Sequence, residues 1–251
     1  DIVWCFDPNL YPNLSHFNIP LKIYHPVEFL AFRYQHKTAS TADAVFTVSS
    51  TNMDNLRKYN NNVHFINHGL NEHFARKAEE NLKKGINYKV PEKVKVGYIG
   101  NLTIHSIDLD TISELIKENP GCEFHFWGPC THKEAAILEK PFHNVILHGN
   151  TPVQQLAEEV QMIDLFILVY KQARYQYDLS NSHKILEYLS TGKPIISTRL
   201  SNYGKNLLIY QVESENAREM LDLFKEIKEN LSDEMNVPES IIVLTIPTEL
   251  I

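Results

Sequence analysis

The stretch from residue 180 to residue 197 carries the side chains best spaced for chemistry, in the order Ser-Asn-Ser-His-Lys-Ile-Leu-Glu-Tyr-Leu-Ser-Thr-Gly-Lys-Pro-Ile-Ile-Ser. Ser180 or Asn181 can cap a helix there, and a helix start after a buried strand offers free N–H groups that suit a phosphate. Lys184 would add a positive charge, and the Glu187 carboxylate can accept hydrogen bonds from two neighbouring hydroxyls of a ribose. This spacing fits a nucleoside diphosphate lying along the helix.

The same spacing also fits a Lys184–Glu187 pair on a solvent-exposed helix, which would contribute only about 0.3 kcal/mol to stability. The stretch predicts a complete helix in either case, because Gly192 suits a left-handed stop and Pro194 ends any continuation. The two interpretations differ in whether Lys184 lies in a binding site or in water.

The order of elements predicts an α/β fold, because short β-branched or aromatic runs alternate with longer segments of helical period. Ser49 gives a helix-start signal directly after a strand. In the first third we expect strands over 2–6, 21–25, 44–48 and 63–66 and helices over 28–40 and 51–59. Residues 75–93 are charged and polar without an apolar stripe, so a linker or interdomain crossing is expected there.

After residue 93, expected strands and helices alternate as in a doubly wound parallel sheet. Thr151 is expected to begin one helix, and Asp108-Leu-Asp110 to begin another rather than to bind a metal. The expected strands cover 94–100, 123–127, 145–147, 164–170 and 194–197, and the expected helices cover 109–117, 152–160, 182–190 and 217–230. A solitary strand is expected over 240–247.

The composition of the chain excludes several classes of function. Its 251 residues include 24 Lys and Arg against 31 Asp and Glu, a net charge of −7. General nucleic-acid binding needs clustered basic residues, so no nucleic-acid partner is expected. Three scattered cysteines and histidines without ligand spacing predict no metal and no cofactor. The absence of a bilayer-length apolar run and of a signal sequence predicts a cytoplasmic location.

Several motifs in a fixed order resemble glycosyltransferases of the GT-B fold, above all those of family 4. The donor-site signature Ser-Asn-x-x-Lys-x-x-Glu-Tyr-Leu-x-x-Gly-Lys-Pro begins at Ser180. The motifs ahead of it are Val96-Gly-Tyr-Ile-Gly-Asn-Leu102, Phe126-Trp-Gly-Pro129, Val145-Ile-Leu-His-Gly149 and Ile163-Asp-Leu-Phe-Ile-Leu-Val-Tyr170. Further upstream, 42–49 and 64–69 resemble the close of the family's first domain, so the resemblance covers residues 42 to 230.

The resemblance implies an α/β, GT-B-like chain with two doubly wound Rossmann-like domains facing a cleft, the first of them incomplete. The implied parts are an acceptor-side domain with its linker over 1–88, a nucleotide-sugar-binding domain over 89–230 and a tail over 231–251. Lys184, beside the phosphates, and Glu187, on the ribose, would be the catalytic residues. The donor-binding residues would be Gly100, Asn101, Thr103, Gly128, Pro129, Gly149, Asn150, Ser180, Asn181 and Ser182.

Three features depart from the family pattern. The glycine-rich loop and the catalytic residue expected early in the first domain are not recognisable, and the other two departures lie in the donor-binding domain. The acidic residue expected eight positions before the ribose glutamate is Leu179, with Asp178 beside it. The loop after Gly100 lacks the basic residues that often assist departure of the diphosphate. The residues that could replace them are Arg174, Arg199 and Lys205.

The activity that the resemblance implies is transfer of a sugar from a UDP- or GDP-sugar to a hydroxyl of a glycan or lipid-linked acceptor. Retention of configuration, independence from metal and a setting in surface polysaccharide synthesis are expected. The nucleotide sugar would be a substrate rather than a cofactor, and peripheral association with the inner face of the membrane stays open. The alternative is a catalytically inactive nucleotide-sugar-binding or regulatory module of the same fold, and a sugar-nucleotide epimerase is a third reading.

Overall fold

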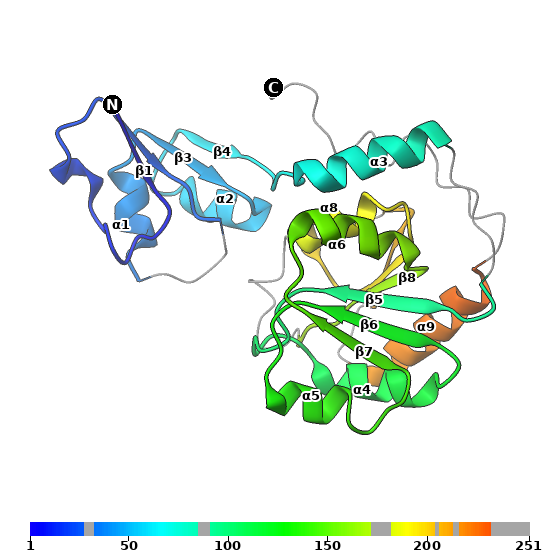
Figure 1. Ribbon diagram of the computed structural model, residues 1–251. Helices are drawn as coiled ribbons and strands as arrows, with labels where there is room; N and C mark the ends of the chain where they lie inside the picture. Colours follow the sequence, from blue (N-terminus) through cyan, green and yellow to red (C-terminus); the bar gives the residue numbers. More distant parts are fainter. Residues whose placement is uncertain (28–32, 85–90, 172–181, 204–205, 213–215, 232–251) are drawn as a thin grey trace. The chain divides into compact units, whose positions relative to one another are not determined.

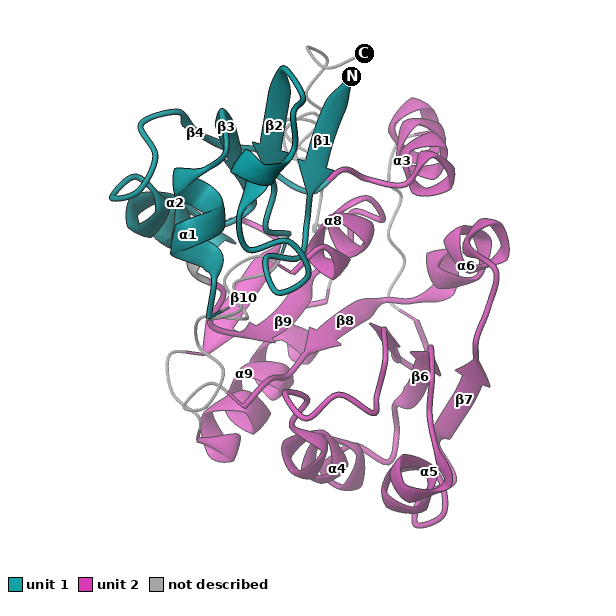
Figure 2. Ribbon diagram, turned by 90° about the vertical axis from the view of Figure 1, so that its left-hand side faces the viewer, with its two compact units in different colours: residues 1–68, 176–181, 201–203 teal, residues 69–175, 182–200, 204–251 magenta. Residues whose placement is uncertain are grey.

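A computed structural model describes residues 1–27, 33–84, 91–171, 182–203, 206–212 and 216–231 (Figure 1). The start of the helix expected over 28–40 and the whole strand expected over 240–247 lie outside these residues. The chain forms two compact units. The described residues of one are 1–27, 33–68 and 201–203, and those of the other are 69–84, 91–171, 182–200, 206–212 and 216–231 (Figure 2). The domain limits expected near residues 88 and 230 stay predictions.

The first unit is a four-stranded parallel sheet in the order β1-β2-β3-β4. Its strands are β1 (Ile2–Cys5), β2 (Leu21–Tyr24), β3 (Ala44–Thr47) and β4 (Val63–Phe65), and its helices are η1 (Leu14–His16), α1 (Gln35–Ser40) and α2 (Ser50–Leu56). All four predicted strands are confirmed. Ser49 caps α2 by accepting a hydrogen bond from the Asn52 N–H at 3.3 Å, as its position after a strand predicted.

The two faces of this sheet differ in burial. Cys5, Tyr24 and Val45 lie in the core on one face, where Leu14, Ala39 and Leu56 pack against them. Alternate residues of β1 point the other way, so Ile2 and Trp4 are 58% and 51% exposed. Trp4 and the neighbouring Phe6 stack there with ring centroids 6.0 Å apart.

The second unit is a six-stranded parallel sheet in the order β10-β9-β8-β5-β6-β7. Its strands are β5 (Lys95–Ile99), β6 (Glu123–Trp127), β7 (Val145–Gly149), β8 (Leu165–Leu168), β9 (Ile195–Thr198) and β10 (Ile209–Val212). The chain runs outward from β5 to β7 and then returns past β5 to build β8, β9 and β10. This order is that of a doubly wound dinucleotide-type fold, with its reversal between β5 and β8.

Helices cover both faces of the six-stranded sheet. They are α3 (Glu72–Lys84), α4 (Leu109–Glu118), α5 (His132–Leu138), α6 (Val153–Glu159) with the short η2 (Val160–Met162), α8 (Lys184–Leu189) and α9 (Ala217–Glu229). Figure 1 shows α4, α5 and α9 on one face and α6 and α8 on the other, with α3 beyond α6. All four residues of β8 are buried, as expected of a parallel strand covered on both sides. None of the described helices is both long and apolar enough to span a membrane.

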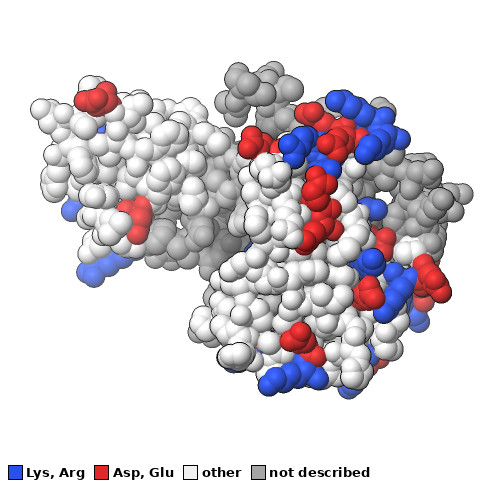
Figure 3. Space-filling view, in the orientation of Figure 1, with Lys and Arg blue, Asp and Glu red and all other residues white. Residues whose placement is uncertain are grey.

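Helix α3 overturns the expectation that residues 75–93 lack an apolar stripe. Phe74 and Ala78 lie four residues apart on one helix face, and both are fully buried. Lys77 pairs with Glu158, so the helix is held against α6. Figure 3 shows acidic and basic side chains interspersed over α3. The charged composition of α3 gave no sign of its short apolar face, which is recognisable only from its packing in the structure.

Three further details differ from the expectations. The helix over 153–159 is preceded by Pro152 in the capping position, without a side-chain cap, so Thr151 does not begin it. Helix α5 and strand β10 were missed. The signal for α5 was present as Thr131-His-Lys-Glu134, which forms a capping box in the structure. β10 has only four residues, and it is held by its pairing with β9.

Candidate functional site

The strand order reverses between β5 and β8, and ligands of doubly wound sheets bind beyond the carboxyl ends of the strands at such a reversal. The loop after β5 turns back against the end of β8. The Asp108 N–H donates to the Val169 carbonyl at 3.0 Å and the Lys171 N–H to the Ser106 carbonyl at 2.8 Å. Asp108 also caps α4 by accepting from the Thr111 N–H, as predicted, so this carboxylate has a structural partner.

Three glycine turns lie side by side at this edge of the sheet. The Gly100 N–H donates to the Trp127 carbonyl at 2.7 Å, and the Gly128 N–H donates to the Gly149 carbonyl at 2.8 Å. All three glycines have positive φ, at 145°, 128° and 70° for Gly100, Gly128 and Gly149. A Cβ at Gly128 would overlap the Gly100 carbonyl, so glycine is needed where the two turns touch.

We expect Gly128→Ala to lower the free energy of unfolding by about 2 kcal/mol or more, because strain from positive φ adds to the overlap with Gly100. Chemical denaturation followed by circular dichroism measures this. Gly121→Ala is the matched control, since a Cβ there meets nothing within 4 Å and its φ is not positive. Equal stability of the two variants would contradict the close approach of the turns.

Several of the predicted donor residues belong to these turns. Asn101 holds its own loop, because its Oδ1 accepts from the Thr103 N–H at 2.9 Å and from the Thr103 hydroxyl at 2.8 Å. Pro129 and Asn150 are exposed next to Gly128 and Gly149. Gly149 ends β7 and Asn150 follows it, two strands across the sheet from β5 and Gly100, so the structure separates them from Lys184.

Helix α8 begins later than predicted. Its first residue is Lys184 and its capping position is His183, without a side-chain cap. Ser180 and Asn181 themselves lie outside the described residues, as do Arg174, Asp178, Leu179 and Lys205. Gly192 has φ 72°, which confirms the predicted left-handed stop after the helix. Arg199 is described and exposed.

Lys184 lies against Gly100, just beyond the carboxyl end of β5, and the residue is only 8% exposed. Its Nζ donates to the Tyr170 hydroxyl at 3.1 Å. A Cβ atom built on Gly100 would lie 3.0 Å from the same Nζ. Among the described residues, no carboxylate lies within ion-pair distance of this Nζ. A buried ammonium without a carboxylate partner is costly, and an anionic ligand would offset that cost. The solvent-exposed interpretation of Lys184 is therefore wrong.

Glu187 lies one turn along α8 and is half-buried. Burial raises the pKa of its carboxyl to about 7, and the nearby positive charge of Lys184 opposes that rise. No hydrogen bond to this carboxyl is found within the described part of the chain. A half-buried carboxyl with free oxygens can accept hydrogen bonds from ligand hydroxyls.

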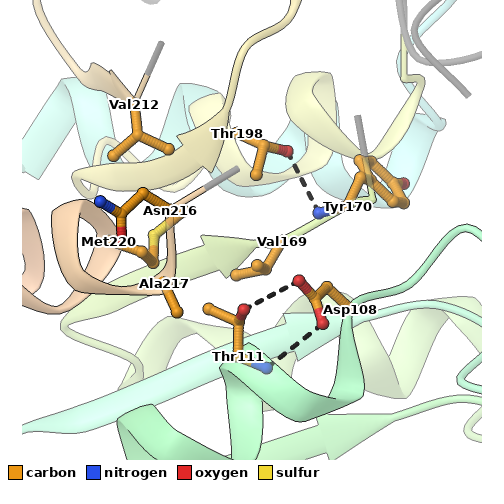
Figure 4. Close-up of a pocket in the computed structure, with 9 residues that line it drawn as sticks. All are labelled: Asp108, Thr111, Val169, Tyr170, Thr198, Val212, Asn216, Ala217 and Met220. Carbon is orange, nitrogen blue, oxygen red and sulfur yellow. Dashed lines mark hydrogen bonds between the residues drawn. The ribbon is translucent and has the colours of Figure 1, made fainter. Parts of the chain in front are cut away.

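Tyr170 was not predicted as a site residue, although it ends the buried run of β8. Its N–H donates to the Thr198 hydroxyl at 3.1 Å, which fixes its backbone against β9 (Figure 4). Its own hydroxyl accepts from Lys184 and lies 3.5 Å from the Ser182 hydroxyl, so the predicted donor residue Ser182 does reach the site. The small pocket in Figure 4, which Thr198 and Asp108 line, lies on the α4 and α9 side of Tyr170.

Comparison with known proteins assigns the family. Residues 93–229, more than half of the chain, match the family described as glycosyl transferases group 1. The chain belongs to the group 1 glycosyl transferases. The family resemblance read from the motifs is confirmed, and the matched region contains the glycine turns, Lys184 and Glu187.

This group 1 glycosyl transferase chain is also similar to individual proteins. TuaH of Bacillus subtilis (strain 168), named as a glycosyltransferase of teichuronic acid biosynthesis, is 28% identical over 116 residues, which cover 45% of the chain and 29% of TuaH. Among solved structures, TarM is similar with a TM-score of 0.69 at 15% identity. The match covers 98% of this chain and 51% of TarM. Alr3699/HepE of Anabaena, solved with UDP, has a TM-score of 0.71 at 11% identity, with coverages of 98% of this chain and 73% of that one.

These similarities bear on the fold and on the extent of the chain. At identities below 25%, the likeness to the solved structures shows the fold alone, and it confirms the GT-B-like, mixed α/β class with parallel sheets. The chain spans less than a third of TuaH and about half of TarM.

Proposed function

We propose that this chain binds the donor of a glycosyltransferase that transfers a sugar from a UDP- or GDP-sugar to a hydroxyl acceptor. The observation that carries the proposal is the buried Lys184 ammonium, which lacks a described carboxylate partner and lies at the reversal of strand order. A diphosphate supplies the missing negative charge there, and Glu187, one helical turn away, is placed for the ribose hydroxyls.

The chemistry follows from the charge that develops on the leaving group. When the bond between the sugar and the diphosphate breaks, negative charge accumulates on the phosphate oxygen, and a fixed positive charge lowers the energy of that state. Lys184 can supply this charge from a site that excludes water, where electrostatic attraction is stronger than in solvent. We therefore propose transfer without a metal ion, and we propose retention of configuration from the family resemblance.

The acceptor is proposed from the relatives. TuaH is named for teichuronic acid biosynthesis and the similar structure WaaG for lipopolysaccharide biosynthesis. A glycan or lipid-linked acceptor in surface polysaccharide synthesis, reached from the cytoplasmic side of the membrane, is consistent with both names.

A catalytically inactive nucleotide-sugar-binding module is the second candidate. It is favoured by the loop over 101–106, Asn-Leu-Thr-Ile-His-Ser, which contains neither Lys nor Arg. Turnover with a panel of nucleotide sugars and acceptors separates the two candidates, because both bind the donor and only the first consumes it. An epimerised donor formed without acceptor would identify an epimerase instead.

The first test is calorimetric titration of UDP, GDP and ADP, with and without magnesium, into the wild type and Glu187→Ala. We expect one nucleotide to bind equally well without magnesium, and the substitution to weaken it roughly tenfold through lost hydrogen bonds to the ribose. Absence of binding by all three nucleotides would refute the donor site, and strict dependence on magnesium would refute the proposed metal independence.

A further inference from the structure

Two tyrosines surround the ammonium of Lys184. Tyr170 accepts its hydrogen bond at 3.1 Å, and the Nζ also lies 5.6 Å from the centre of the Tyr170 ring and 5.8 Å from the centre of the Tyr98 ring. Both ring distances are within the range in which an aromatic ring attracts a cation. Tyr98 comes from β5, and Tyr170 lies two residues beyond the end of β8, so the two strands at the reversal of strand order each lead to one ring.

The hydroxyl of Tyr98 points to the same place as the ammonium. A Cβ built on Gly100 would be 3.0 Å from the Tyr98 hydroxyl and 3.0 Å from the Lys184 Nζ. The small glycine therefore makes room for both groups. Any larger residue at position 100 would displace the lysine from this point.

Tyr98 has an unusual hydroxyl for a core side chain. The residue is fully buried, and its hydroxyl has no hydrogen-bond partner within the described part of the chain. Tyr188, also fully buried, instead hydrogen-bonds the Ile99 N–H at 2.9 Å. Because an unpaired buried hydroxyl costs free energy, a phenylalanine would serve packing alone at least as well.

Neutral partners suit a lysine that must bind an anion. A carboxylate would neutralise the ammonium and compete with phosphate, whereas phenol oxygens and aromatic faces stabilise the cation and leave its net charge intact. An ammonium has three N–H donors, so one bond to Tyr170 leaves others free for ligand oxygens.

We propose that Tyr98 and Tyr170 are positioning residues that hold the Lys184 ammonium against Gly100, charged and directed towards the donor diphosphate. The identity of the anion rests on the proposed function. The arrangement of Tyr98 and Tyr170 around the Lys184 Nζ, which we call the holder, rests on the contacts described above. The opposing view is that Tyr98 is only a core ring packed on Phe126, with centroids 6.1 Å apart.

The holder is tested without ligand by the reactivity of Lys184. Wild type, Tyr98→Phe and Tyr170→Phe are treated with an amine-acylating ester, and modification at Lys184 is followed by mass spectrometry. We expect several-fold faster modification in Tyr170→Phe, which removes the hydrogen bond that holds the ammonium, and a smaller increase in Tyr98→Phe, which keeps the ring and removes only the hydroxyl that faces the same point. Tyr24→Phe is the control, since it removes an equally buried hydroxyl without a hydrogen-bond partner in the other unit. Unchanged reactivity in both tyrosine variants would overturn the proposal.

The purpose of the holder is tested by coupling to Lys184. Affinities for UDP and inorganic pyrophosphate are measured for the two tyrosine variants, alone and combined with Lys184→Met. We expect each single tyrosine variant to bind about 3- to 10-fold more weakly, and no further loss once Lys184 is methionine. Losses of the same size in the Lys184→Met background would overturn the role in aiming the lysine. No binding by the wild type would refute the proposed function, while faster acylation in the variants would still support the holder.

Discussion

Replacing Lys184 with methionine is expected to weaken binding of the donor nucleoside diphosphate by roughly 10- to 100-fold, with little loss of stability. Loss of a charge-assisted contact to a phosphate costs about 1.5 to 3 kcal/mol. The folded protein does not lose an ion pair, because no described carboxylate neutralises this ammonium, and methionine refills the buried stem of the side chain. Isothermal titration with UDP and GDP, together with denaturation of both proteins, measures the two effects.

Lys117→Met is the matched control for this substitution. Lys117 is an exposed lysine in the last turn of α4, at the opposite end of that helix from Asp108, and its replacement by methionine makes the same change in net charge. We expect its affinity to remain within twofold of the wild type. Equal losses in the two lysine variants would mean that only the overall charge of the protein matters, and the proposed phosphate contact would be withdrawn.

Glu187→Gln is expected to stabilise the protein at pH 8 relative to the wild type and to make little difference at pH 4.5. The unfolded carboxyl releases its proton near its ordinary pKa of 4.5, whereas burial raises the folded pKa to about 7. Between these values the unfolded state binds fewer protons, so wild-type stability falls as pH rises. The loss is about 3 kcal/mol once pH exceeds 7, and glutamine, which cannot ionise, avoids it.

The measurement is urea denaturation of both proteins at half-unit steps from pH 4.5 to 8. Glu114→Gln, at an exposed position of α4, is expected to follow the wild-type curve across the whole range. If the difference between Glu187→Gln and the wild type were constant with pH, or largest at pH 4.5, the raised pKa would be wrong. The same glutamine should also bind the ribose less well, because an amide offers one acceptor oxygen where a carboxylate offers two.

The boundaries of most elements could be predicted because they depend on neighbouring residues. The strand over Glu123–Trp127 was predicted to the residue. Asp108 was expected at a helix start and caps α4 through its own side chain. Such signals act over three or four residues, so the elements can be predicted from them without knowledge of the fold.

Elements held by distant contacts were harder to read. Helix α3 has a charged composition, and its two buried residues, Phe74 and Ala78, gain their packing from the second unit's α6 side. Strand β10 consists of four residues stabilised by pairing with β9. In both cases the stabilising partner lies elsewhere in the chain, and local propensity is a weak guide.

The sequence by itself determined that Lys184 and Glu187 share a helix after a buried strand, and that glycines end β5, β6 and β7. Only the tertiary structure decided that β8 lies beside β5, which brings Tyr98, Gly100 and Tyr170 around the lysine and removes its charge from water. The reason is physical. Helical period and glycine turns are properties of neighbouring residues, whereas strand order joins segments some 70 residues apart, and the burial of Lys184 follows from that juxtaposition.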